Sequence, residues 1–415
     1  MKILLSALAC EPNRGTEEGV GWNTAWELAK YHQVWVFTRT IYRLAIEAEL
    51  ACNPVPNLHF VYFDPLGWID DWKRQQWGLQ LHYYLWQVWA YFIALPLNRD
   101  ICFDLICHVT YAKYWSPSFL AMLPVPFIWG PVGGGESAPT AFRKDFSFRG
   151  KNYEFLRDLI RWVGERDPFV LLTAQKSTVA LAQTEETAQR LRSLRVKEVQ
   201  VFSNTGLPKE DISLLAQCGV PEEGVVRFIS MGRLIDWKGF HLGLRAFALL
   251  KIERAEYWIM GDGYARKRLE ALARKLGVEK KVRFWGNLPR QEMLSKLREC
   301  HLLVHPSLHD SGGGVCAEMM AAGRPVICLD LGGPATQVTG ETGIKVPAYN
   351  PEQVVRDLAD AMTRLACNPE LRVRMGEAGR MRVSDLFNWD VKGKFFAQLY
   401  EEILDREKSS DSPSQ

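Results

Sequence analysis

The sequence lacks a large excess of charge of either sign. Its 51 Lys and Arg residues nearly balance 48 Asp and Glu residues, which leaves a formal net charge of +3 at neutral pH. A protein that binds nucleic acid mainly through bulk electrostatics carries a clear basic excess. The balance therefore argues against that class of protein, and we expect no nucleic-acid partner.

A cysteine framework is also missing. The nine cysteines are an odd number and are scattered, with no C-x-x-C spacing. Several of them, including Cys107, Cys300 and Cys328, lie in apolar stretches. This pattern indicates small buried side chains in a reducing cytosol rather than disulfides or a zinc site.

Long hydrophobic runs are scarce. The first ten residues hold one Lys and a short apolar run that turns polar at Glu11, too short for a signal peptide, so we expect no export signal. Residues 75–98 contain no Asp, Glu, Lys or Arg, but they include three glutamines at helical spacing, Gln87 among them. A spanning helix needs about 20 mostly apolar residues. We therefore predict a soluble amphipathic helix with a polar glutamine stripe that ends near Pro96.

What the sequence does have is a repeated strand-then-helix order. With 415 residues the chain is too long for one ordinary core. The repeat predicts an α/β fold with two doubly wound, Rossmann-like domains, each a mostly parallel sheet covered by helices. The strands expected in the first half are 2–9, 33–38, 58–63, 105–109, 125–129, 178–182 and 198–202. Those expected in the second half are 227–231, 256–260, 282–285, 302–305 and 326–330.

A stretch at 203–224 that carries Asn204, Gly206, Pro208 and Pro221 separates the two halves. In doubly wound sheets ligands bind beyond the carboxyl ends of the strands, so we expect both domains to face a central cleft. The expected divisions are an N-terminal domain at 1–205 with an aromatic-rich insertion at about 68–98, a C-terminal domain at 206–385, a helix at 386–408 that crosses back to the N-terminal domain, and a disordered tail at 409–415.

Two cations follow the first predicted strand of the second half. Arg233 and Lys238 lie in one loop with Gly232, just before a predicted helix. Positive side chains beside a helix N-terminus form an anion site that suits a diphosphate. The alternative is an ordinary solvated loop.

A glycine-rich stretch leads into another predicted helix of the second half. Gly312, Gly313 and Gly314 allow backbone N–H groups to approach an anionic or hydroxyl-rich ligand, and Val315 follows them. Glu318 lies one turn into the helix, where its carboxylate can accept hydrogen bonds from a pair of sugar hydroxyl groups. The alternatives are a plain turn and a first-turn acid that stabilises the helix dipole.

These clusters, in this order and spacing, resemble the retaining nucleotide-sugar glycosyltransferases of the family 4 type, which have the GT-B fold. The likeness covers nearly the whole chain and is strongest at about 227–347. Residues 260–263 (MGDG), 282–286 (VRFWG) and 318–326 (EMMAAGRPV) also match the usual run of that family. The resemblance implies a metal-independent hexosyltransferase that takes a nucleotide-diphosphate sugar as its donor and acts in glycan, exopolysaccharide or glycolipid synthesis.

The resemblance also implies a role for each matching position. Arg233 and Lys238 hold the donor diphosphate and stabilise the leaving nucleotide, while Glu318 accepts the ribose hydroxyls. In the E-x7-E pattern of the family the first carboxylate lies near the donor sugar, and its position here is Asp310, which is one methylene shorter. Gly312 stands where the family usually has an aromatic residue.

Four residues of the first half complete the expected site. Gly19 lies in the loop after the first strand, which the family uses under the donor phosphates. His108 ends a predicted strand where the family often has a His near the donor sugar; the alternative is a core histidine. Gly134 and Glu136 follow another strand end, and we assign them an acceptor-side role.

No D-x-D motif of the kind that holds a divalent cation in metal-dependent transferases is present. We accordingly expect no metal site and no cofactor, with the nucleotide sugar as a substrate. Two alternatives to a transferase are open: a non-catalytic nucleotide-sugar binding protein, and a GT-B-type epimerase, for which only Asp310 and His108 offer acid/base groups.

Tryptophan is the one residue in clear surplus, with 15 in the chain. A cluster of five in the first half favours an acceptor surface for a sugar chain or lipid-linked substrate, or a peripheral membrane contact at the inner face, assisted by the basic stretch 153–166. The alternative is a helix packed across its own sheet. We expect a cytoplasmic protein in either case. The five are Trp68, Trp72, Trp77, Trp86 and Trp89.

Overall fold

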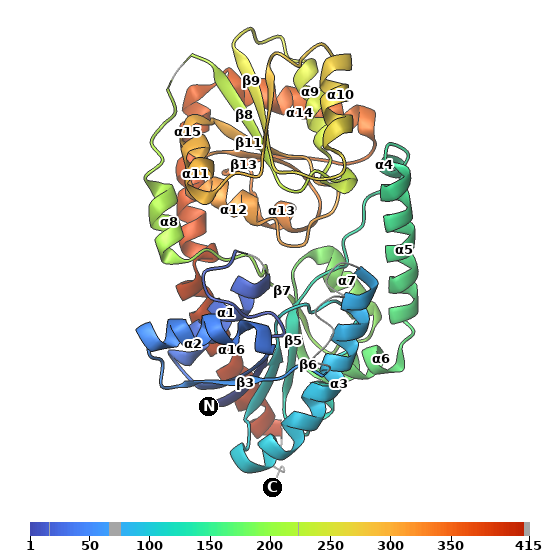
Figure 1. Cartoon of the computed structure of the whole chain (residues 1–415), viewed down its shortest axis with the longest axis vertical. Helices are drawn as coiled ribbons and strands as arrows, with labels where there is room; N and C mark the ends of the chain where they lie inside the picture. The colour runs from blue at the N-terminus through green and yellow to red at the C-terminus, as the bar shows by residue number, and fades with distance from the viewer. Residues whose placement is uncertain (16, 66–75, 223, 411–415) are drawn as a thin grey trace. The chain divides into compact units, whose positions relative to one another are not determined.

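The structure, a computed structural model, describes residues 1–15, 17–65, 76–222 and 224–410. The chain forms two compact units (Figure 1). Residues 136–157, which we expected in the N-terminal domain, group with the second unit. Unit 1 comprises Met1–Gly135, Asp158–Asn204 and Trp389–Gln415, and unit 2 comprises Glu136–Arg157 and Thr205–Asn388.

Unit 1 is built, in its described residues, on a seven-stranded parallel sheet in the order β3-β2-β1-β4-β5-β6-β7. Successive strand residues face opposite sides of the sheet: Leu4 packs in one core with α3, and Ile3 and Leu5 pack in another with α1 and α16. Both faces are therefore covered, as expected for a doubly wound sheet. The strands are β1 (Lys2–Ser6), β2 (Gln33–Thr38), β3 (Leu58–Tyr62), β4 (Leu105–His108), β5 (Phe127–Val132), β6 (Ser177–Ala182) and β7 (Val199–Val201).

The helices of unit 1 lie on both faces of this sheet (Figure 1). Helix α5 (Phe148–Gly164) begins in unit 2 and ends in unit 1. The others are α1 (Glu17–Ala29), η1 (Thr40–Tyr42), α2 (Arg43–Cys52), α3 (Gln76–Ile101), η3 (Phe119–Met122), α6 (Pro168–Lys176), α7 (Glu185–Ser193) and α16 (Trp389–Ser410).

Unit 2 repeats the pattern with a six-stranded parallel sheet in its described residues, ordered β10-β9-β8-β11-β12-β13. Phe228 packs on one face and Ile229 on the other, so this sheet also has two cores. The predicted α/β class with two doubly wound sheets is confirmed. The strands are β8 (Val226–Met231), β9 (Ala255–Met260), β10 (Val282–Gly286), β11 (Leu302–His305), β12 (Val326–Leu329) and β13 (Gly343–Val346).

Helices and short turns connect the strands of unit 2, and α4 (Thr140–Arg143) precedes them in the chain. The others are α8 (Lys209–Ala216), η4 (Asp236–Lys238), α9 (Phe240–Ala248), α10 (Arg266–Lys275), α11 (Arg290–Glu299), α12 (Gly314–Ala321), α13 (Gly332–Gln337), α14 (Pro351–Ala366), α15 (Pro369–Arg382) and η5 (Val383–Phe387).

Helix α3 differs from our expectation in two ways. It continues through Pro96 to Ile101 instead of ending there. Gln87, expected on an outward polar stripe, is fully buried, and its Oε1 accepts a hydrogen bond from Ser118 Oγ at 3.3 Å. Apolar residues cover so much of this helix that its sequence does not define a single inward face. Among the side chains of α3 that the structure describes, residues 81–101, the large apolar ones that are exposed are Leu81, Trp89 and Phe92.

The tryptophan cluster divides between core and surface. Trp86 is fully buried: its ring stacks on Phe63 with 4.7 Å between centroids, and its Nε1 donates to the Phe63 carbonyl oxygen at 3.3 Å. Trp89 is 46% exposed. Trp68 and Trp72 lie outside the described residues, and the description of Trp77 is limited to its backbone in α3.

Helix α16 belongs to unit 1, where Phe396 and Tyr400 are buried in the core that α1 also lines. It includes residues 409–410 of the expected tail, whereas 411–415 lie outside the described residues. Across the described parts of the chain, no helix combines the length and the apolar character needed to cross a membrane.

Candidate functional site

The loop after β8 holds Arg233 and Lys238 and is shaped by two glycines. Gly232 has φ = 139° and Gly239 has φ = 68°, both in the region that favours glycine. A Cβ atom on Gly239 would lie 1.9 Å from the carbonyl oxygen of Pro306. The absence of a side chain at Gly239 therefore lets this loop pack directly against the loop after β11.

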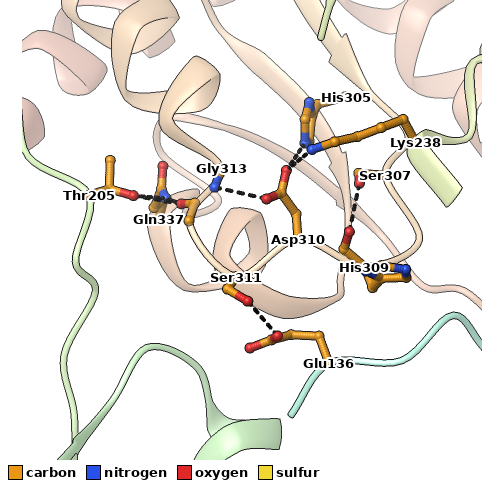
Figure 2. A network of polar contacts seen from close by, with 11 residues as sticks. Glu136, Thr205, Lys238, His305, Ser307, His309, Asp310, Ser311, Gly313 and Gln337 are labelled. Carbon is orange, nitrogen blue, oxygen red and sulfur yellow. Dashed lines mark hydrogen bonds and ion pairs between the residues drawn. The ribbon is translucent and has the colours of Figure 1, made fainter. Parts of the chain in front are cut away.

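That packing brings Lys238 to Asp310. Lys238 Nζ donates to Asp310 Oδ2, and His305 Nε2 lies 3.2 Å from the same oxygen (Figure 2). The other carboxylate oxygen, Oδ1, accepts from the backbone N–H of Gly313 at 3.3 Å. Both members of the ion pair are mostly buried, with 17% of each side chain exposed.

The charges of this cluster follow from its neighbours. Burial raises the pKa of Asp310, but the Lys238 ammonium and the His305 hydrogen bond outweigh burial and hold that pKa well below its ordinary value. The pKa of His305 is lowered, first by burial and then by the charge of Lys238, against the opposing hydrogen bond to Asp310. At neutral pH Asp310 is therefore a carboxylate, and His305 is a neutral imidazole that donates from Nε2.

The two predicted diphosphate cations are held differently. Lys238 is engaged with Asp310, while Arg233 is exposed and forms no ion pair with any residue that the structure describes. A guanidinium in solvent is available to an incoming anion without first breaking a protein contact. The expected role of Arg233 in binding the diphosphate stays a prediction.

The glycine-rich stretch starts α12. Gly313, with φ = 64°, is the N-cap, and α12 begins at the exposed Gly314 with the half-buried Val315 next. First-turn N–H groups of a helix have no partner within the helix, so they are free to bind an anion. The carbonyl oxygen of Gly312 instead accepts from Thr205 Oγ1 at 2.6 Å and from Gln337, which holds the stretch in place (Figure 2).

Glu318 lies on α12 beside a cation that the sequence did not reveal. Its Oε1 is 3.2 Å from Nη1 of Arg290, whose Nη2 is 3.1 Å from Oδ1 of Asp211. Burial raises the pKa of Glu318, while Arg290 lowers it. Arg290 therefore orients the Glu318 carboxylate, which we expect to accept hydrogen bonds from the ribose hydroxyl groups.

Glu136 belongs to unit 2 and contacts Ser311, the residue after Asp310. Its Oε2 accepts from Ser311 Oγ at 2.5 Å, and its side chain is buried. The expected acceptor-side role of Glu136 is untested, but its contact is with the loop that carries Asp310. Within the described residues, no group of His, Cys, Asp or Glu side chains is arranged to hold a metal ion.

Comparison with known sequences identifies the part of unit 2 that contains Lys238, His305 and Asp310. Residues 219–382 match the family described as Glycosyl transferases group 1. The chain carries a glycosyltransferase group 1 domain. Arg233, Lys238, Asp310 and Glu318 all lie within it.

Relatives of the group 1 domain act on different substrates. The D-inositol 3-phosphate glycosyltransferase of Streptomyces avermitilis is 32% identical over 200 residues, which are 45% of this chain and 41% of that protein. The lipopolysaccharide core biosynthesis glycosyltransferase LpsE of Rhizobium meliloti is 30% identical over 222 residues, 53% of this chain and 63% of LpsE. The chain thus spans less than half of the first relative and less than two thirds of the second.

Likeness to solved structures extends further along the chain. Anabaena HepE in complex with UDP matches with a TM-score of 0.63 at 16% identity, over 97% of this chain and all of that one. At this identity the likeness concerns the fold, and it confirms the expected GT-B class.

His108 lies outside the group 1 domain, at the end of β4 in the core of unit 1. Its Nε2 is 3.0 Å from the carbonyl oxygen of Thr110, its Nδ1 is 3.0 Å from Ser118 Oγ, and the ring is fully buried. Burial lowers the pKa of His108 to about 4. Protein atoms satisfy both ring nitrogens, so the geometry favours a core histidine over a group that contacts the donor sugar.

Gly19 and Gly134 are also positioned by packing within unit 1. A Cβ on Gly19 would lie 1.8 Å from the carbonyl oxygen of Arg14, so the loop after β1 crosses the start of α1 at this glycine. Gly134 has φ = 99°, and a Cβ there would lie 2.3 Å from the ring of Trp115. Arg161 Nη2 donates to its carbonyl oxygen. The structure therefore gives each glycine a packing reason, and their expected ligand roles stay predictions.

Sequence reasoning missed His305 and Arg290. His305 is the last residue of β11, a position that the rule on strand carboxyl ends selects. That rule would have found it. Arg290 is the first residue of α11, and its contact with Glu318 depends on tertiary packing that no local pattern encodes.

Proposed function

We propose that the protein is a retaining, metal-independent glycosyltransferase that moves a hexosyl group from a nucleotide-diphosphate sugar to a sugar or lipid-linked acceptor in glycan, exopolysaccharide or glycolipid synthesis. The observation that carries the proposal is the mostly buried Lys238–Asp310 pair in a group 1 domain that also contains Arg233 and Glu318. UDP in HepE and the core lipopolysaccharide role of LpsE support the donor and the product class.

The proposed reaction breaks the bond between the anomeric carbon and the diphosphate oxygen. Negative charge then develops on the leaving nucleoside diphosphate. Arg233, Lys238 and the first-turn N–H groups of α12 supply fixed positive charge to that group. Glu318 binds the ribose, and Asp310 faces the sugar and keeps Lys238 oriented. The acceptor hydroxyl attacks on the face from which the diphosphate departs, as the family resemblance implies.

A donor panel tests the function. The protein is incubated with UDP-, GDP- and ADP-sugars, with and without oligosaccharide and lipid-linked acceptors, and released nucleotide is measured. Release that increases with acceptor supports transfer. Tight nucleotide binding without turnover would instead indicate a binding protein, and a changed sugar on an intact donor would indicate an epimerase.

Two further measurements test the finer claims. The anomeric configuration of the product, read from NMR coupling constants during the reaction, shows retention or inversion. A chelator such as EDTA should leave the rate unchanged, because two protein cations take the place of a divalent ion in this proposal. Loss of activity with EDTA that added Mg²⁺ or Mn²⁺ restores would overturn metal independence.

We further propose that an aromatic surface of unit 1 contacts lipid at the cytoplasmic face of the inner membrane. Helices α3 and α6 both pack on η3, where Phe119 lies between Tyr84 at 5.4 Å and Phe169 at 5.0 Å. Exposed rings next to basic side chains suit the headgroup region of a bilayer; Arg166 covers the ring of Trp162 at 4.2 Å. Among the described side chains of these helices and the end of α5, the large apolar ones that are exposed are Leu81, Trp89, Phe92, Leu159, Trp162, Val163 and Phe169.

Vesicle flotation tests the membrane contact. With liposomes that contain an anionic phospholipid, the wild-type protein should float, and the double variant Trp89→Ser, Phe92→Ser should float several-fold less. Leu44→Ser is the matched control, because Leu44 is 84% exposed on α2, away from the aromatic surface. Equal flotation of all three proteins, or none, contradicts the proposal.

A further inference from the structure

Residues 136–157 follow β5 in the chain but are built into unit 2. Ala138, Phe142 and Phe146 are buried in the hydrophobic core of that unit, together with Phe240 of α9. Burying side chains of this size ties the segment firmly to the group 1 domain. The segment is therefore a fixed part of the unit that holds the donor-site cluster.

One set of contacts joins this segment to the loop of Lys238. Asp236, two residues before Lys238, accepts from the backbone N–H of Ser147 at 3.2 Å and from its Oγ at 2.5 Å. Gly150 approaches Asp236 so closely that a Cβ would lie 2.2 Å from Oδ2. Asp236 is buried, so these bonds hold it where no water competes for the carboxylate.

A second set joins the segment to the loop of Asp310, and it touches the residue on each side. His309 Nε2 is 2.8 Å from Glu154 Oε1. Ser311 Oγ donates to Glu136 Oε2 at 2.5 Å (Figure 2).

A stack of rings connects the two sets. Trp237, the neighbour of Lys238, stacks on Tyr153 with 4.1 Å between ring centroids and on His309 with 5.3 Å, and both pairs are 11° from parallel. Glu154 follows Tyr153 in α5, and its hydrogen bond to His309 holds the second ring that stacks on Trp237. One turn of α5 thus contacts the neighbours of both Lys238 and Asp310.

We propose that residues 136–157 form a strap that positions Lys238 and Asp310 for the donor diphosphate, with Glu154 as its central positioning residue. Neither loop can shift without breaking a contact to the strap, because both loops contact residues at the start of the same helix, α5. This inference rests on the proposed function for its consequence in catalysis. The restraint on the loops is testable without turnover.

The central contact is strong because it is buried and charged. Glu154 is 1% exposed, and its Oε2 lies 3.5 Å from Nη2 of Arg143. Burial raises the pKa of Glu154, but the bond to His309 and the charges of Arg157 and Arg143 lower it overall. A hydrogen bond to a charged group of this kind costs about tenfold or more in an equilibrium when it is lost.

Amide hydrogen exchange measures the restraint directly. In Glu154→Ala, exchange in residues 236–239 and 307–313 should rise about tenfold over wild type. The matched control is Glu352→Ala: Glu352 makes an exposed 3.5 Å ion pair with Lys144 of the strap and touches neither loop. Glu154→Gln keeps an oxygen that accepts from His309 but loses the charge, so its exchange should lie between wild type and Glu154→Ala. Unchanged exchange in Glu154→Ala, or equal increases in Glu352→Ala, would overturn the proposal.

Nucleotide binding and turnover then separate the two proposals. Binding of UDP, GDP and ADP is measured by calorimetry, and kcat and KM are measured with the active donor. We expect kcat to fall about tenfold in Glu154→Ala, to recover in part in Glu154→Gln and to be unchanged in Glu352→Ala. If the wild-type protein neither binds nor turns over any nucleotide, the proposed function is contradicted. The hydrogen-exchange result then tests by itself whether the strap restrains the two loops. Should Glu154→Ala not fold, Ser311→Ala removes the donor to Glu136 and should raise exchange in 307–313 alone; no rise would count against the strap.

Discussion

Lys238 and Asp310 restrain each other in a site that is mostly closed to solvent. Lys238→Ala would remove a cation from the proposed diphosphate site and leave the Asp310 carboxylate with two donors among the described residues, His305 and the Gly313 N–H. Loss of one preorganised charge-stabilising group costs about 3 kcal/mol of transition-state stabilisation, or about 10²-fold in rate. We expect a loss of that size in kcat/KM.

Glu318→Ala tests the other end of the donor. Arg290 keeps its ion pair with Asp211 in this variant, so the local fold should persist while the ribose loses its acceptor. We expect a loss of several kcal/mol of transition-state stabilisation here too, with a clear rise in the donor KM. Lys144→Ala, on an exposed pair of the same unit, serves as the control for both variants. Retained activity in both Lys238→Ala and Glu318→Ala would show that the site is elsewhere.

We expect His305 to contribute to catalysis through the hydrogen bond that its Nε2–H group donates to Asp310, rather than through the packing of its ring. His305→Gln keeps a donor near the Nε2 position, whereas His305→Leu leaves Asp310 Oδ2 with Lys238 alone. We expect about a tenfold loss of kcat/KM in the Leu variant and near-wild-type values in the Gln variant, since the bond is made to a charged acceptor. The Leu substitution should add little in an Asp310→Asn background, where the charged acceptor is absent. Additive effects of the two substitutions would argue against this link.

At the scale of whole elements, apolar periodicity predicted the seven strands of the first sheet and five strands of the second. It missed β13 (Gly343–Val346), a four-residue edge strand with an exposed Lys345 and no apolar run. It also ended α3 at Pro96, because proline usually terminates a helix. Both errors arise where tertiary packing decides an element that the local pattern leaves ambiguous.

The junction of β8 and α9 gives an element-scale prediction. Gly239→Ala adds a Cβ both at φ = 68° and 1.9 Å from the Pro306 carbonyl oxygen, so the loops of Lys238 and Asp310 must separate. Gly277→Ala is the matched control: its φ of 71° is similar, but a Cβ there meets nothing within 4 Å. The control should lose about 1 kcal/mol from the left-handed backbone alone. Gly239→Ala should lose clearly more and should weaken nucleotide binding; equal losses in thermal unfolding would contradict this account.

At the scale of the whole molecule, the sequence predicted only part of how the chain divides between the two units. We expected a boundary after residue 205 and a helix at 386–408 that crosses back to the N-terminal domain. The chain passes between the units at 204/205 and 388/389, and also at 135/136 and 157/158, where we expected no boundary. The motif residues Arg233, Lys238, Asp310 and Glu318 were identifiable because they follow strands in a regular repeat. The contacts of Glu154 and Glu136 were not, because they join residues more than 150 positions apart.

Lys392 lies near two of these crossings and is buried in unit 1. Its Nζ donates to the carbonyl oxygen of Ser203 at 2.6 Å and lies 4.2 Å from the centroid of the Phe202 ring. Helix α16 is thereby tied to the last residues before the chain enters unit 2. Burial lowers the pKa of Lys392 from 10.5 to about 7, because the charged form loses hydration.

This lowered pKa makes the stability of unit 1 depend on pH in a direction that can be worked out. Between pH 7 and 8 the unfolded chain keeps the Lys392 proton while the folded chain releases it, so the unfolded state binds more protons and the free energy of unfolding rises with pH. We expect the wild-type slope to exceed that of Lys392→Met by up to about 1.4 kcal/mol per pH unit, as measured by chemical denaturation at pH 7.0, 7.5 and 8.0. Lys394→Met, at an exposed position of the same helix, should keep the wild-type slope. Parallel slopes for wild type and Lys392→Met would show that Lys392 does not titrate in this range.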